Sequence, residues 1–170
     1  MVVRKRLNLT GPAIAFITTT VFGWKPVLIQ DNVAKILVQE FRNLSGFYEI
    51  SVLSYVIMPS HIHALLGFPG IEILSKTIQT FKSISSRQVK ELMIPELKEN
   101  EYKLWKPRFD DLIVTTEKSL KIKMDYIHNN PVKAGLVANA IDWNYSSAID
   151  WLTDKEGLIK IDKEYHWLIR

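Results

Sequence analysis

The stretch YVIMPSHIHALLGF (residues 55–68) consists of two apolar runs on either side of one Pro-Ser break. Short apolar runs bounded by turn residues are typical of buried strands, and Pro59 with Ser60 indicates a tight turn between them. We therefore predict an antiparallel pair of strands. Two histidines, His61 and His63, begin the second run, although a buried strand normally favours apolar side chains.

The segments around this pair alternate between strand and helix patterns. Runs of β-branched and aromatic residues indicate strands, and apolar residues at helical spacing indicate amphipathic helices. The predicted strands cover residues 13–24, 47–58, 61–68 and 108–116, and the predicted helices cover residues 31–44, 71–92 and 117–129. Ser45 and Gly46 are predicted to end the first helix.

The order βαββαβ, followed by one more helix, predicts the α+β class. Its simplest arrangement is a ferredoxin-like plait, an antiparallel sheet with helices packed on one face. The length of 170 residues is enough for one domain with a core. We predict a single domain over residues 1–170, with a core of about 13–137 and a C-terminal extension over residues 138–170.

The composition narrows the classes of function. The chain has no cysteine, which excludes a disulfide framework, a thiolate zinc site and a cysteine nucleophile. Arg4, Lys5 and Arg6 precede a segment broken by Gly11 and Pro12, which makes a poor signal peptide. We expect a cytoplasmic, nucleoid-associated protein. The net charge of +4 is compatible with an anionic partner such as nucleic acid.

The histidine pair suggests a metal site. Side chains alternate between the faces of a strand, so His61 and His63 point to the same side and Ile62 and Ala64 to the other. Two neutral imidazoles on one face can bind one divalent ion. An isolated His-X-His pattern is nevertheless more often a pair of exposed or hydrogen-bonded histidines. A third ligand would also have to come from elsewhere in the chain.

The helix predicted over residues 117–129 carries a second polar group. Tyr126 and Lys123 lie off its apolar face, and Asn130 follows Tyr126 by one turn. An amide oxygen is an acceptable ligand for Mg²⁺ or Mn²⁺. Asn130 also fits the N-cap of a new turn because it precedes Pro131, and the spacing alone favours this cap. His128 is an alternative third ligand.

A tyrosine beside a metal ion suggests phosphoryl-transfer chemistry. A phenol is a weak nucleophile until it is activated, and a metal ion can polarise a phosphodiester and stabilise the departing oxygen. Attack by tyrosine would give a phosphotyrosine and a free 3′-hydroxyl. The covalent link keeps the phosphodiester energy, which suits cutting and rejoining DNA better than hydrolysis.

Several segments together resemble a known family. His61-Ile62-His63 is similar to the HUH pair (His, hydrophobic, His) of single-strand nucleases and transposases. The segments YVIMPSHIHALL, YIHNNPVKAGLV and DWNYSSAIDW resemble those of the REP-associated tyrosine transposases. The resemblance covers residues 13–152. It implies a ferredoxin-like plait that cleaves and rejoins hairpin-containing single-stranded DNA through a 5′-phosphotyrosine, with Mg²⁺ or Mn²⁺.

The resemblance also assigns roles to residues. It implies that His61 and His63 are metal ligands, that Tyr126 is the nucleophile and that Asn130 is the third ligand. Ser60 departs from the family pattern, because many members have Asn before the first histidine. Some relatives are dimers that exchange the tyrosine helix and others are monomers, so a homodimer stays open.

Basic and aromatic residues predict a surface for single-stranded DNA. The predicted contacts are Lys82, Arg108, Lys123 and Lys133, with residues 4–6 as a basic arm. Trp105 and Trp143 can either stack on bases or serve structurally. Three other functions remain open: a domesticated, non-catalytic hairpin-binding protein, an RNA-binding plait, and a metal hydrolase that uses the His pair alone. An assay for protein–DNA adducts separates them.

Overall fold

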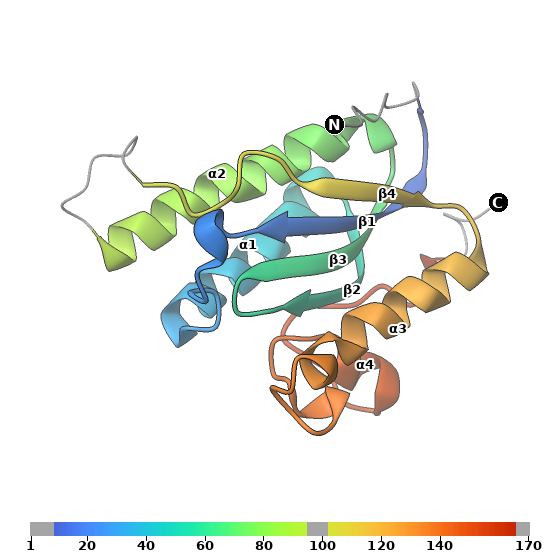
Figure 1. Cartoon of the computed structure of the whole chain (residues 1–170). Coiled ribbons are helices and arrows are strands. Elements are labelled where there is room, and N and C mark those ends of the chain that lie inside the picture. The colour runs from blue at the N-terminus through green and yellow to red at the C-terminus, as the bar shows by residue number, and fades with distance from the viewer. Residues whose placement is uncertain (1–8, 95–101, 166–170) are drawn as a thin grey trace.

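The sheet has four strands. The computed structural model describes residues 9–94 and 102–165, so the basic arm predicted at residues 4–6 lies outside the described residues. The strands lie in the order β2-β3-β1-β4 and every neighbouring pair is antiparallel (Figure 1). Their bounds are β1 Ala13–Thr20, β2 Ser51–Ile57, β3 His61–Phe68 and β4 Asp110–Val114. The predicted ferredoxin-like antiparallel sheet is confirmed.

Two long helices cover one face of this sheet. Helix α1 (Asp31–Tyr48) joins β1 to β2, and α2 (Leu74–Met93) joins β3 to β4. Each helix crosses between two strands that are parallel to each other, and the right-handed hand of such crossovers brings both helices to the same side. The apolar residues Leu74, Ile78, Phe81 and Val89 of α2 are buried in the cluster between the helices and the sheet.

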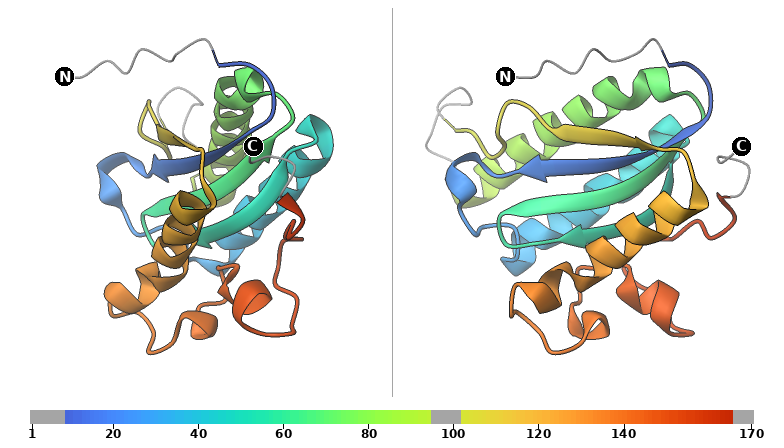
Figure 2. Two further views of the ribbon diagram at one scale, coloured as in Figure 1. Left: turned by 90° about the vertical axis from the view of Figure 1, so that its right-hand side faces the viewer. Right: turned by 45° about the vertical axis from the view of Figure 1, so that its right-hand side comes forward.

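The third helix is on the opposite face. Helix α3 (Glu117–Lys133) follows β4 and packs against β2 and β3 (Figure 2). The prediction that the helices pack on one face therefore holds for α1 and α2 and is wrong for α3. Helix α3 does not connect two strands, so no crossover rule fixes its side. It packs on this face because the apolar residues Ile14, Phe16 and Leu65 there are buried against it. None of the described helices is long and apolar enough to cross a membrane.

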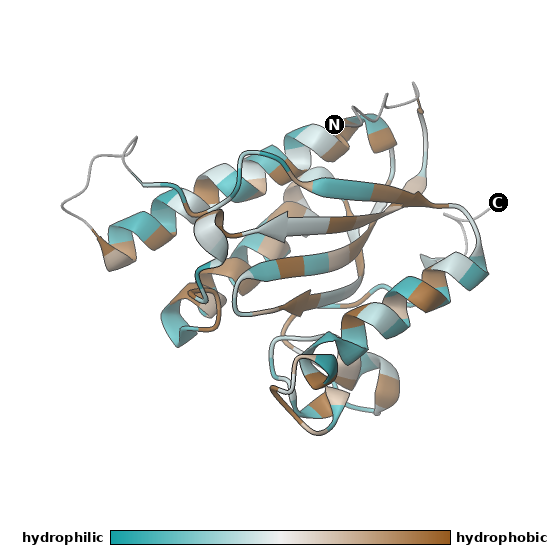
Figure 3. Ribbon diagram, in the orientation of Figure 1, coloured by the Kyte–Doolittle hydropathy of each residue, from teal (hydrophilic) through white to brown (hydrophobic). Residues whose placement is uncertain are grey.

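The two sheet faces differ in what they bury. In β3, Ile62 and Ala64 join the apolar cluster under α1 and α2, whereas His61 and His63 occupy the alternate positions toward α3. The start of β3 accordingly alternates between hydrophilic and hydrophobic colours in Figure 3. The predicted shared face of the two histidines is confirmed, and it is the face that α3 covers only in part.

Several predicted boundaries differ from those observed. Strand β1 ends at Thr20, and the short 3-10 helix η1 (Phe22–Trp24) follows. Helix α1 continues past Ser45 and Gly46 to Tyr48, so the first residues predicted as strand 47–58 are helical. The hydroxyl of Tyr48 lies 3.0 Å from that of Thr80 on α2, and this tertiary contact favours one more helical turn than local propensity predicts.

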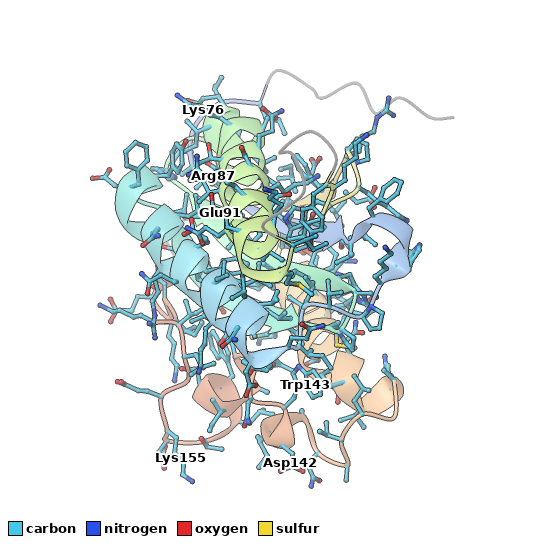
Figure 4. All side chains as sticks on the ribbon, turned by 90° about the vertical axis from the view of Figure 1, so that its left-hand side faces the viewer. Lys76, Arg87, Glu91, Asp142, Trp143 and Lys155 are labelled. Carbon is cyan, nitrogen blue, oxygen red and sulfur yellow. The ribbon has the colours of Figure 1, made fainter. Side chains whose placement is uncertain are left out.

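The chain after α3 covers the outer edge of the sheet. It contains a 3-10 helix, η4 (Ala140–Asp142), and a short helix, α4 (Ala148–Leu152). The backbone N–H of Ile57 donates to Tyr145 at 2.8 Å, and that of Ser147 donates to Tyr55 at 3.0 Å. Trp143, labelled in Figure 4, donates its indole N–H to the Ile57 carbonyl at 3.0 Å. These bonds satisfy edge groups of β2 that would otherwise be unpaired.

Candidate active site

The histidine pair lies at the start of β3, opposite the end of β1. The antiparallel register pairs His61 with Thr20 and His63 with Thr18. The two imidazole centroids are 4.8 Å apart. His63 is buried, with 6% of its surface exposed, and His61 is half-buried. Adjacent same-face positions therefore bring the two rings together, as the sequence predicted.

A hydroxyl lies against the Nδ1 atom of each ring. Thr18 Oγ1 is 2.8 Å from Nδ1 of His63, and Ser60 Oγ is 3.3 Å from Nδ1 of His61. A hydrogen bond at one ring nitrogen fixes the tautomer and orientation of the other. Nε2 of each histidine is thereby the atom left for a ligand or a reacting group.

Both imidazoles are kept neutral. Burial, with smaller contributions from the nearby His61 and Lys123, lowers the pKa of His63 to about 3. Burial also lowers the pKa of His61. A neutral imidazole nitrogen is the form that binds a metal ion, so the electrostatics of this pair suit a metal ligand and disfavour a general acid.

Tyr126 reaches the same point from α3. Its Oη atom is 3.4 Å from Nε2 of His63, and the two ring centroids are 5.1 Å apart. The ring also packs edge-on against Phe16 of β1, whose ring stacks on His63. The Tyr126 side chain is 39% exposed. A phenol whose ring is held in place and whose side chain is partly exposed can meet a substrate.

The core-facing residues of α3 explain this orientation. They recur at helical spacing: Leu120, Met124, Ile127, His128 and Pro131 are all buried. Lys123, Tyr126, Asn130 and Lys133 lie together on one flank of that face, because each is three or four residues from the next. Thr116 accepts a hydrogen bond from the N–H of Ser119 and caps the helix. The apolar face thus sets the rotation that points Tyr126 at the histidines.

Asn130 is inside the helix, not at the start of a new turn. Helix α3 runs on to Lys133, four residues past its predicted end, and Ala134 is its C-cap. The preference for an N-cap at Asn130 is therefore wrong. Pro131 continues the buried face, and this packing outweighs the local bias against helix before a proline. Asn130 stays one turn from Tyr126 and is half-buried.

His128, the alternative ligand, belongs to a different cluster. Its Nε2 atom is 3.0 Å from Ser54 Oγ and 2.9 Å from Ser147 Oγ, and all three residues are buried. Burial lowers the pKa of His128 to about 4, which keeps the ring neutral. The described residues contain no group of three or more His, Cys, Asp or Glu that could hold a metal ion. Asn130 is therefore the better candidate for the third ligand.

Cations surround the tyrosine. Lys123 Nζ is 4.5 Å from the ring centroid of Phe16 and 5.8 Å from that of Tyr126, and Lys133 Nζ is 5.9 Å from the latter. Of the four predicted DNA contacts, these two lie at the candidate site. Their positive charge favours an anionic phosphate beside the phenol.

The other two predicted contacts lie beside α2. Lys82 Nζ donates to the carbonyls of Lys106 at 2.6 Å, Pro107 at 3.3 Å and Arg108 at 3.1 Å. This ammonium therefore fastens the segment before β4 to α2, a structural role that sequence analysis missed. Arg108 is exposed at the rim of a pocket shared with Gln79 and Phe109. A DNA contact by either cation stays a prediction.

Sequence analysis also missed Thr18 and Trp24, and it left two roles open for Trp105 and Trp143. The pairing of Thr18 with His63 depends on the register of β1 against β3, which the sequence does not specify. Trp105 is buried and donates its indole N–H to Ser85 at 2.9 Å, and Trp143 is bonded to β2. Both are structural, whereas Trp24 is exposed next to His61, with ring centroids 6.0 Å apart.

Comparison with known proteins gives the family. The model of the family described as "Transposase IS200 like" matches residues 20–130. The chain belongs to the IS200-like transposases. The matched region includes both histidines, Tyr126 and Asn130, whereas Phe16, Thr18 and Lys133 of the candidate site lie just outside it.

Two curated relatives of this IS200-like transposase agree with the resemblance seen in the sequence. A protein of Haemophilus influenzae named as a candidate REP-associated tyrosine transposase is 29% identical over 133 residues, 71% of this chain and 76% of the relative. The REP-associated tyrosine transposase of Escherichia coli is 28% identical over 112 residues, 59% of this chain and 62% of the relative. The predicted resemblance to REP-associated tyrosine transposases is confirmed.

A solved structure supports the fold of this IS200-like transposase. It is a REP-associated tyrosine transposase bound to a REP hairpin, and it superposes with a TM-score of 0.74 at 20% identity. The match covers 96% of this chain and 93% of the solved chain. At this level of identity the likeness concerns the fold, and it extends over the C-terminal segment as well as the sheet.

Proposed function

We propose that this protein cleaves and rejoins single-stranded DNA that carries hairpins, with Tyr126 as the nucleophile. Its family places it among the enzymes of DNA transposition. The observation that carries the finer proposal is the contact between Tyr126 and His63: a half-exposed phenol lies 3.4 Å from a neutral imidazole whose neighbour is a second histidine. A hairpin-binding protein without catalysis would not need this arrangement.

The residues fit a divalent ion with mixed nitrogen and oxygen ligands, Mg²⁺ or Mn²⁺. His61 and His63 would hold it through Nε2, since Nδ1 of each ring faces a hydroxyl, and Asn130 would add an amide oxygen. The ion would polarise the phosphodiester and stabilise charge on the departing oxygen. Burial of the histidines helps because neutral rings do not have to lose a proton to bind it.

Tyr126 would carry out the covalent step. Its Oη atom attacks the phosphorus, the Oη–P bond forms and the bond from phosphorus to the 3′-oxygen breaks. The phenol proton passes to water, which the exposed side of Tyr126 admits, and the departing oxygen takes up a proton as a free 3′-hydroxyl. In rejoining, a 3′-hydroxyl attacks the phosphotyrosine and the Oη–P bond breaks.

Lys123 and Lys133 would position the strand. Each ammonium lies within 6 Å of the Tyr126 ring centroid, close enough to pair with the phosphates beside the one attacked. Hairpin DNA is the proposed substrate because the solved relative is bound to a REP hairpin. The residues of the site all come from one chain, and a homodimer stays a prediction.

The test is covalent capture of DNA. A labelled hairpin oligonucleotide with single-stranded flanks is incubated with the protein and Mn²⁺, then separated under denaturing conditions. We expect a protein–DNA adduct that mass spectrometry assigns to Tyr126. Tyr126→Phe should bind the oligonucleotide and Mn²⁺ normally and form no adduct.

Tyr145→Phe is the matched control. Its phenol donates a hydrogen bond to Asp31 at 3.0 Å, away from the histidines, so this variant should form the adduct at the wild-type rate. An adduct that persists in Tyr126→Phe, or maps to another tyrosine, would contradict the proposal. Binding without any adduct in the wild type would favour the non-catalytic hairpin-binding alternative.

A further inference from the structure

Trp24 is an aromatic side chain beside the candidate site to which the proposed mechanism gives no role. It is 58% exposed, and its ring meets His61 edge to face, with centroids 6.0 Å apart. Among the four tryptophans in residues 9–94 and 102–165, it is the one that is exposed. An exposed indole beside a half-buried imidazole adds little to the core, so its position requires another explanation.

The backbone at Trp24 is in an unfavourable conformation. Gly23 and Trp24 have φ angles of 70° and 57°, in the left-handed region that bulky residues rarely adopt. Hydrogen bonds from Val21 N–H to Ser60 and from Phe22 N–H to Leu104, each 2.8 Å, hold the turn in place. Such strain persists where the surrounding structure over-determines it, and it concentrates at binding sites.

A lysine completes the arrangement. Lys106 Nζ lies 4.3 Å from the centroid of the Trp24 ring, and the N–H of Lys106 donates to Thr20 at 2.8 Å. The indole thus contacts both a cation on the segment before β4 and the imidazole of His61 on β3. An aromatic face next to a positive charge is the combination that binds a base of single-stranded nucleic acid together with its phosphate.

We propose that Trp24 and Lys106 form a binding site for one unpaired nucleobase of the DNA strand and its adjoining phosphate. The base stacks on the exposed indole, and the ammonium of Lys106 pairs with the phosphate. Because the ring touches His61, the nucleotide bound there lies next to the phosphate that Tyr126 attacks. The inference rests on the proposed function in taking single-stranded DNA as the substrate.

The test combines a protein variant with a missing base. Affinities are measured in the Tyr126→Phe background, so that no strand is cut, for a hairpin oligonucleotide whose single-stranded flank carries one abasic site at each position in turn. Stacking on one aromatic residue is worth roughly 5- to 150-fold in affinity. We expect one position where the abasic site weakens binding by this factor with Trp24 present and has no effect in Trp24→Ala.

Three further variants separate binding from structure. Trp24→Phe should keep part of the affinity, because a smaller ring still stacks. Trp24→Gly should bind as weakly as Trp24→Ala and melt at a higher temperature than Trp24→Ala, because glycine accepts a positive φ without strain. Phe47→Ala is the control. It removes an aromatic ring that is 80% exposed on α1, the helix on the other face of the sheet, and should change neither the affinity nor the melting temperature.

The outcomes distinguish this inference from the proposed function. If the Trp24→Ala loss is the same at every abasic position, the stacking site is refuted even when adduct formation proceeds. If one position shows the expected coupling and the wild type forms no adduct, the base-binding site stands and the catalytic proposal fails. A Trp24→Gly variant that melts below Trp24→Ala would also overturn the inference, since the backbone would then not be strained by the side chain.

Discussion

His63 and His128 both lie where α3 packs on the sheet, and they differ in what their Nε2 atoms can reach. His63 belongs to β3 and His128 to α3, and both are buried between the helix and the sheet. Both have a pKa lowered by burial, and both contact hydroxyl groups. Nε2 of His63 faces the half-exposed Tyr126, whereas Nε2 of His128 is closed off by Ser54 and Ser147. A lowered pKa therefore does not identify the site here; the open nitrogen does.

The largest expected effect contrasts the two histidines directly. His63→Ala should abolish adduct formation, because it removes a proposed metal ligand next to Tyr126, and should weaken Mn²⁺ binding measured by calorimetry. His128→Ala should form the adduct at the wild-type rate at low temperature, while urea unfolding shows a loss of about 2–3 kcal/mol from the cavity and the unsatisfied hydroxyls. A His128→Ala variant that forms no adduct and keeps its stability would contradict the assignment of different roles to the two histidines.

The second prediction concerns stability in acid. Burial lowers the pKa of His128 from the ordinary 6.5 to about 4, so protonation favours the unfolded chain. The stabilisation from neutral His128 is complete above pH 6.5 and is lost as the pH falls to about 4, by about 3 kcal/mol in total. His128→Asn should flatten the fall in unfolding free energy across this window, as measured by urea titration at several pH values. An unchanged slope would mean that His128 titrates normally.

A smaller effect is expected at Thr18, whose hydroxyl contacts Nδ1 of His63. Thr18→Val keeps the shape of the side chain and removes the hydroxyl 2.8 Å from Nδ1. Residues that orient a metal ligand are typically worth about 10- to 100-fold in metal affinity, so the concentration of Mn²⁺ that half-saturates cleavage should rise by that factor. Ser54→Ala, which alters the His128 cluster instead, is the control and should leave the Mn²⁺ requirement unchanged.

The smallest effect should come from the lysines beside Tyr126. Lys123→Gln should weaken hairpin binding a few-fold and reduce the salt dependence by about 0.7 in the slope of log affinity against log salt, the value for one phosphate contact on a single strand. Lys121→Gln changes a lysine on the opposite flank of α3 and should alter neither. Equal slopes for wild type and Lys123→Gln would remove Lys123 from the proposed DNA surface.

Much of the site followed from short-range patterns. The alternation in β3 placed His61 and His63 on one face, and the apolar spacing of α3 left Tyr126 beside that face. The end of α3 did not follow, because the bias at Asn130 is local and the burial of Pro131 that overrides it is tertiary. The role of Lys82 was missed for a similar reason: its three carbonyl partners lie 24 to 26 residues away in the sequence.

The sequence by itself determined the order of strands and helices along the chain, the shared face of the histidines and the flank of α3 that carries Tyr126, because strand and helix periods are properties of neighbouring residues. Only the tertiary structure decided which sheet face α3 covers and which hydroxyl orients His63. It also decided that the Nε2 atom of His128 is enclosed by hydroxyl groups. The contacts that settle these points join residues 45, 63 and 74 positions apart. Their partners are chosen by how whole elements pack, and no local period encodes that choice.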